Sequence, residues 1–146
     1  MLSSSAVGTS FERSFGLYQD LLGVLDARAL TSGLPGLPSN SIGAQLWCVV
    51  GARESYARAI TAGGWAGFTC SLDEPGDPGR VAAALESSAA TVASALRSRE
   101  RLTDLQERLV LDLLEHEAQH HGQLIRYLYG LRLPIPASWK DRYALD

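Results

Sequence analysis

Apolar residues recur every three or four positions in four stretches of the chain, which is the spacing of amphipathic helices. The stretches run from about residue 10 to 30, 41 to 62, 77 to 97 and 103 to 129. None alternates polar and apolar residues over the length of a strand. The pattern therefore predicts an all-α fold, most simply a four-helix bundle, as a single domain over residues 1–146.

Capping residues mark the predicted helix boundaries, because short polar side chains accept hydrogen bonds from free backbone N–H groups. Asn40 or Ser41 can begin the second helix, Asp77 the third and Thr103 the fourth. Gly130 is the predicted end of the fourth helix. The sequence FTCSLDEPGDPGR predicts a long connection between helices two and three, of a length that often borders a functional site.

The ending, LRLPIPASWKDRYALD, is predicted to be irregular at first. Its Trp139 and Tyr143 are expected to pack either onto the helices or onto a second subunit. Trp47, Trp65 and Trp139 are most simply core or interface anchors.

Composition and charge exclude several classes of protein. Of the 146 residues, 46% are hydrophobic, which is typical of a globular chain. The net charge is −3 and the basic residues are scattered, so nucleic acid is not an expected partner. No apolar run is long enough for a membrane span, and the first residues lack signal-peptide features, so we expect a cytoplasmic protein. Two cysteines are too few for a disulfide framework.

The stretch LLEHEAQHHGQLIRY, residues 113–127, contains every histidine of the chain. At about 100° per residue, His116 and His120 continue the inward apolar stripe, whereas His121 lies off it and is expected to be more exposed. Two histidines four positions apart can bind one metal ion, with Asp112 or Glu117 holding a far ring nitrogen. The alternative is a pair of core or interface histidines that bond to their neighbours. The inward stripe consists of Leu105, Leu109, Leu113, His116, His120, Leu124 and Tyr127.

The letters HEAQH also match the HExxH pattern of zinc proteases. Such an enzyme needs a third ligand downstream, and no glutamate follows Glu117. The extended motif needs glycine and histidine where this chain has Gln123 and Arg126. We therefore do not expect a protease.

Two motifs resemble a known family. HEAQHHGQLIRY is similar to the last-helix motif of the DinB/YfiT-like superfamily, and SIGAQLWCVVGARESY is similar to its second-helix segment. The tail LYGLRLPIPASWKDRYAL also looks like the ending of some members. The resemblance covers about Ser41 to Leu145. It implies a four-helix bundle, often a homodimer, with a divalent metal ion held by three histidines.

Carried onto this chain, two of those histidines fall on His116 and His120, and the third falls on Cys48. In one interpretation Cys48 replaces the histidine, giving a Cys48, His116 and His120 site with an open fourth position. That ligand set favours zinc first and nickel second. In the other, the site is lost and Cys48 is an ordinary buried cysteine. Arg53 is expected to reach the same cavity, paired with Glu54 or a nearby carboxylate.

The resemblance implies an enzyme in which the metal activates a low-molecular-weight thiol or a water against a small electrophile. The reaction would be thiol transfer or hydrolysis. The alternative is a non-catalytic, stress-linked binding or interaction module with a vestigial metal site. A third hypothesis is redox sensing by Cys48, which predicts metal release on oxidation.

Overall fold

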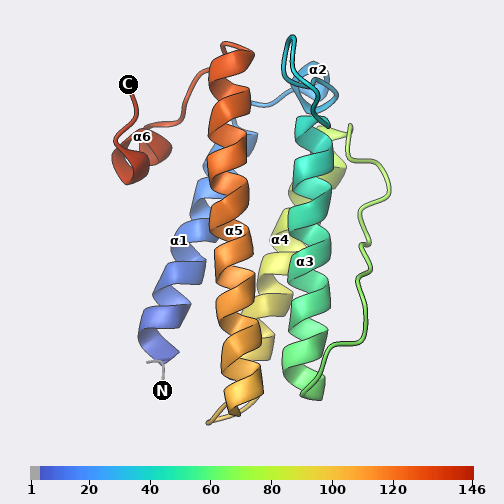
Figure 1. Ribbon diagram of the computed structural model, residues 1–146, viewed down its shortest axis with the longest axis vertical. Coiled ribbons are helices and arrows are strands. Elements are labelled where there is room, and N and C mark those ends of the chain that lie inside the picture. Colours follow the sequence, from blue (N-terminus) through green and yellow to red (C-terminus); the bar gives the residue numbers. More distant parts are fainter. Residues whose placement is uncertain (1–3) are drawn as a thin grey trace.

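The computed structural model describes residues 4–146, and within them the protein is all-α, with six helices and no strand (Figure 1). The all-α prediction is confirmed. Helix α3 packs most extensively on α4 and α5, so it is central to the bundle. Four long helices lie side by side, namely α1 (Ser4–Leu22), α3 (Ile42–Ala62), α4 (Pro78–Arg97) and α5 (Asp104–Gly130), and two short ones are α2 (Ala27–Leu30) and α6 (Ala137–Tyr143).

The helix starts predicted from capping residues are confirmed, whereas the first long helix begins at Ser4 and not near residue 10. Ser41, and not Asn40, caps α3, and its side chain accepts a hydrogen bond from the N–H of Ala44. Asp77 caps α4 in the same way. Thr103 begins α5 in a full capping box, in which its backbone N–H donates to the side chain of Gln106 while its own hydroxyl accepts from the Gln106 N–H.

The predicted end of the first helix is wrong. The first helix does not continue to residue 30, because the chain turns at Gly23 and the side chain of Asp26 then caps the separate helix α2 by accepting from Ala29 N–H. The fourth long helix, α5, does end at Gly130 as predicted, and Leu131 is its cap. The tail also contains a helix, α6, that the sequence pattern did not predict.

The core follows the helical stripes, with one exception. Leu113 and Leu124 are buried in α5, but Leu105, which lies in the first turn, is 50% exposed, so its predicted place in the stripe is wrong. Trp139 of α6 is fully buried, and its indole N–H donates to the backbone oxygen of Leu17 at 2.7 Å. The tail therefore packs onto its own bundle.

The connection between α3 and α4 runs along the side of α3 (Figure 1). Two glycines of α3 permit its close approach. A Cβ atom at Gly51 would lie 2.2 Å from Cζ of Phe68, and one at Gly43 would lie 2.3 Å from the backbone oxygen of Pro75. The connection is thus packed against the helix that carries Cys48, which restrains the position of α3.

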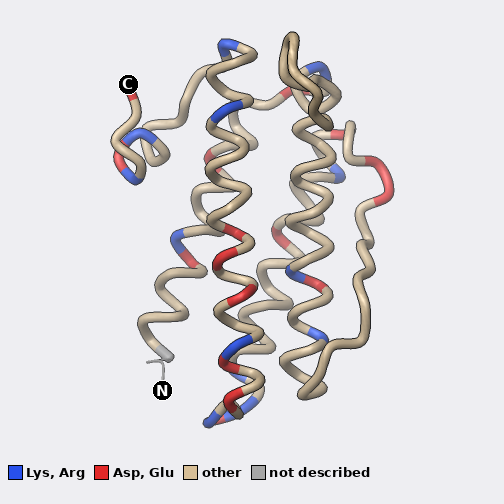
Figure 2. Tube along the Cα trace, in the orientation of Figure 1, with Lys and Arg blue, Asp and Glu red and all other residues tan. Residues whose placement is uncertain are grey.

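Charged residues are distributed over several elements. Figure 2 shows arginine and lysine on most of the helices, with no single element collecting them. No helix of the described chain is long and apolar enough to cross a membrane.

Candidate metal centre

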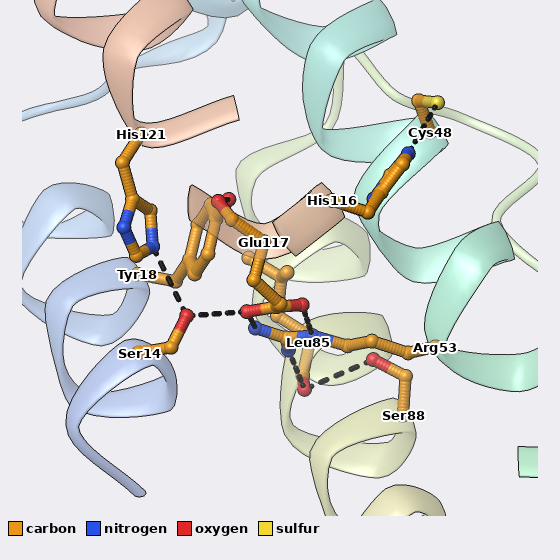
Figure 3. A network of polar contacts seen from close by, with 9 residues as sticks. All are labelled: Ser14, Tyr18, Cys48, Arg53, Leu85, Ser88, His116, Glu117 and His121. Atoms are coloured by element: carbon orange, nitrogen blue, oxygen red, sulfur yellow. Dashed lines mark hydrogen bonds and ion pairs between the residues drawn. The ribbon is translucent and has the colours of Figure 1, made fainter. Parts of the chain in front are cut away.

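The structure brings together the three residues that the sequence and the resemblance indicated. Cys48 on α3 and His116 and His120 on α5 place one ligand atom each within 4.8 Å of one another. The Sγ atom of Cys48 lies 3.5 Å from Nε2 of His116, and the two imidazole rings are 4.5 Å apart (Figure 3 shows the first contact). In tetrahedral zinc coordination, sulfur and nitrogen ligands lie about 3.5 Å apart. The cluster could therefore hold a metal ion.

A chain of amide and hydroxyl groups fixes the ring of His120. The hydroxyl of Tyr127 and the amide nitrogen of Gln45 both donate to Oδ1 of Asn40, at 2.7 Å and 2.9 Å. The Oε1 atom of Gln45 therefore faces His120, where Nδ1 lies 2.5 Å away. Since an amide oxygen can only accept, Nδ1 of His120 carries the proton. Nε2 of His120 is left with a free lone pair, which is what a metal ligand requires.

The acids predicted to hold the far ring nitrogens do not do so. Asp112 is exposed, and Glu117 points to a different face of α5. Nδ1 of His116 is buried without a hydrogen-bond partner among the described residues. The ring of His116 is therefore held less firmly by the protein than the ring of His120.

Burial sets the protonation states of the three ligand side chains. It lowers the pKa of His116, and it lowers the pKa of His120 to about 4, with the charge of His116 adding to the effect. Both imidazoles are neutral at pH 7, the form that binds metal. Burial raises the pKa of the Cys48 thiol, so metal binding would have to release its proton.

The neighbouring face of α5 carries a second polar cluster, built around Glu117. This carboxylate is fully buried and receives two hydrogen bonds from Arg53, at 2.6 Å and 3.0 Å, and one from Ser14 at 2.5 Å (Figure 3). Arg53 also donates to the backbone oxygen of Leu85 at 3.0 Å. The partner of Arg53 is thus Glu117, whereas Glu54 accepts hydrogen bonds from the connecting segment at Ser71.

This pairing holds Glu117 in its ionised form. Burial alone would raise the pKa of Glu117, but the charge of Arg53 and the hydrogen bonds from Arg53 and Ser14 outweigh burial and lower the pKa. A carboxylate so held cannot serve as the general base of a zinc protease. The HExxH letters therefore describe two different faces of one helix and not one active site.

The prediction that His121 is more exposed is wrong, since only 3% of its surface is accessible. Its Nε2 lies 3.0 Å from Oγ of Ser14, and its Nδ1 lies 2.6 Å from the hydroxyl of Tyr143. Helices α1 and α6 cover this face of α5, and the sequence pattern did not reveal the second of them. Burial lowers the pKa of His121 to about 4, while Glu117 acts in the opposite direction and Arg53 adds to the decrease.

Two further features, Cys70 and a cavity between helices, lie outside the Cys48, His116 and His120 cluster. Cys70 is partly buried and its thiol donates to the backbone oxygen of Trp47 at 3.3 Å. A cavity of about 410 Å³ lies between α1, α4 and α5, where Phe11, Phe15 and Leu96 line it, and it includes none of the three cluster residues.

No family model matches the sequence, and no curated protein matches it. The assignment to the DinB/YfiT-like superfamily therefore stays a prediction from the motifs. The geometry of the Cys48, His116 and His120 cluster is what points to a function.

Proposed function

We propose that the protein is a metal-binding four-helix bundle of the DinB/YfiT type, in which Cys48, His116 and His120 hold one divalent ion. The observation that carries the proposal is the convergence of one sulfur and two imidazoles within 4.8 Å, with the tautomer of His120 fixed by Gln45. Thiolate and imidazole ligands favour zinc, with nickel as the second choice.

We further propose that the site is catalytic. A divalent ion with an open position supplies a Lewis acid that lowers the pKa of a thiol or water. The protein residues contribute the remaining conditions. Gln45 keeps Nε2 of His120 unprotonated, and Cys48 would give up its proton when the site fills. The reaction would be thiol transfer to, or hydrolysis of, a small electrophile.

A homodimer is part of the same proposal. Trp47 and Phe68 are 37% and 42% exposed, and the centres of their tilted rings lie 5.3 Å apart. Trp47 directly precedes the candidate ligand Cys48 in the sequence. Exposed aromatic side chains of this kind are enriched at protein interfaces. A non-catalytic binding module remains the alternative, and it would use the same exposed surface.

The test is the metal content of untagged protein, measured by elemental analysis for the wild type, Cys48→Ala, His120→Ala and Cys70→Ala. The proposal expects about one ion per chain in the wild type and in Cys70→Ala, which removes the cysteine outside the cluster, and a loss in the other two. Circular dichroism checks that each variant is folded. No bound metal after incubation with zinc or nickel would overturn the site. Loss in His120→Ala alone would remove Cys48 from the ligand set.

Catalysis is tested separately on the loaded protein. Turnover of an electrophile with a small thiol, abolished by His120→Ala and retained in Cys70→Ala, would support the enzyme. A fully loaded protein without turnover for thiol or water would favour the binding module.

A further inference from the structure

A second cavity, of about 150 Å³, lies on the face of α5 that is turned toward α1 and α6. One wall consists of residues of α1 spaced three or four apart, and the other consists of residues of α5 with the same spacing. The end of α6 closes the cavity. Its lining includes Arg13, Ser14, Leu114, His121, Arg142 and Tyr143.

The lining carries two positive charges that no carboxylate matches. Arg13 comes from α1 and Arg142 from α6, and within residues 4–146 neither guanidinium forms an ion pair. Glu117 is the one carboxylate among the described residues that line the cavity, and Arg53 already neutralises it at 2.6 Å. The side chains that line the cavity therefore carry an excess of positive charge, and a positive concave surface concentrates anions.

The polar groups on the floor bond to one another. The Ser14 hydroxyl donates to Glu117, so Oγ of Ser14 accepts from Nε2–H of His121, and Nδ1 of His121 accepts from the Tyr143 hydroxyl. The floor thus leaves no unpaired carboxylate to attract a cation. The available donors are the guanidinium groups of Arg13 and Arg142.

Both guanidinium groups also influence Tyr143, which lines the cavity. The guanidinium carbon of Arg142 lies 5.3 Å from the ring centre of Tyr143, a stacking contact that orients the arginine. Burial raises the pKa of Tyr143, and the charges of Arg142 and Arg13 oppose that rise. Both charges therefore act on a group that lines the cavity.

We infer that this cavity is a binding site for a small oxyanion, a carboxylate or phosphate group held between Arg13 and Arg142. A guanidinium presents paired N–H donors that match two oxygens of such a group. The volume suits an ion of a few non-hydrogen atoms, since pockets for drug-sized ligands start at about 300 Å³. The site is separate from the candidate metal centre, because the metal-binding pair faces α3.

The experiment is calorimetric titration of the full chain with inorganic phosphate and, separately, with acetate, at constant ionic strength. Treatment with a chelator beforehand prevents either anion from binding at a metal ion, so the outcome does not depend on the proposed function. We expect saturable binding at one site. Arg13→Ala and Arg142→Ala should each weaken it about tenfold, because each removes a charge-assisted hydrogen-bond donor.

The matched control is Arg126→Ala, which removes the same charge from an exposed position of α5 outside the cavity. It should leave the affinity unchanged. Equal weakening by all three variants would mean attraction to net charge alone and would overturn the site, as would the absence of saturable binding to both ions. Tighter binding of phosphate would identify a phosphoryl group as the natural ligand, and tighter binding of acetate a carboxylate.

Discussion

Helix α5 carries two pairs of polar side chains with the same spacing and opposite surroundings. His116 and His120 lie in the cluster with Cys48 of α3. Glu117 instead bonds to Arg53 of α3 and Ser14 of α1, and His121 bonds to Ser14 and to Tyr143 of α6. Each pair is separated by four residues, and the two pairs are offset by one position, about 100° around the helix. The second pair is saturated, because every side-chain nitrogen and oxygen in it has a protein partner. In the first pair, Nδ1 of His116 has no partner among the described residues. One ligand atom from each histidine lies within 4.8 Å of the Cys48 sulfur.

The difference shows what separates a candidate metal site from a polar core. Both clusters are buried or half-buried and both contain histidine, so neither residue type nor burial distinguishes them. The protein supplies Glu117 with an arginine and a serine, whereas it supplies His120 with a single acceptor that orients the ring. A buried polar group without a partner is costly. The ligand atoms of Cys48, His116 and His120 lie close enough together that they could hold a metal ion.

The largest expected effect comes from breaking the saturated pair. Arg53→Met leaves Glu117 charged and unpaired in the core, which should lower the free energy of unfolding by about 3–5 kcal/mol. Urea unfolding of metal-free protein measures it. The control is Arg80→Met, which removes an exposed ion pair with Asp73 and should change stability little. Similar small effects for both variants would contradict the view that the Glu117 cluster holds the core together.

The double variant Arg53→Met with Glu117→Met sharpens this test. Removing both charges leaves no unpaired ion, so the double variant should be more stable than Arg53→Met alone. If the two are equally unstable, the loss comes from packing of the arginine side chain and not from the stranded charge.

His116 and His120 should differ from the Glu117 cluster, because their effect on stability should depend on added metal. At a zinc concentration about a hundredfold above the dissociation constant, binding should stabilise the wild type by about 2.7 kcal/mol. His116→Ala should lose this gain, because it removes one of three ligands. Thermal unfolding with and without zinc measures both. An equal gain in the variant would place the metal elsewhere.

The third prediction concerns the residue that orients His120. Gln45→Leu removes the acceptor at Nδ1 and should weaken zinc binding about 10- to 100-fold, the usual effect of losing such a partner. Competition with a zinc-sensitive dye measures the affinity. Gln123→Leu is the matched control, because Oε1 of Gln123 has no partner among the described residues. A comparable loss in the control would show that the orientation of His120 is not what matters.

The sequence predicted the parts of this arrangement that depend on one helix at a time. The spacing of His116 and His120 places them on one face, and capping residues located the start of each long helix after the first. Cys48 came from the similarity of the second-helix motif, and the structure places it beside His116.

The parts that depend on several elements were not predictable in the same way. The pairing of Arg53 with Glu117 requires the relative rotation of α3 and α5, which periodicity does not specify. His121 is buried because α6 folds back over α5, and the prolines before α6 concealed that helix. Gln45 was not predicted, because a carboxylate, Asp112 or Glu117, was expected at the far ring nitrogen of a ligand histidine. A glutamine within the apolar stripe of α3 was an available signal.

The smallest expected effect tests how completely the second cluster is saturated. Tyr143→Phe removes the donor to Nδ1 of His121 and should lower the free energy of unfolding by about 1 kcal/mol, the net value of one hydrogen bond. Tyr129→Phe, at an exposed position, should have no measurable effect. Zinc affinity should be unchanged in both, because His121 belongs to the face of α5 that does not hold the ion. A weaker zinc affinity in Tyr143→Phe would show that the two faces are coupled through the helix, and the contrast between them would then be one of degree.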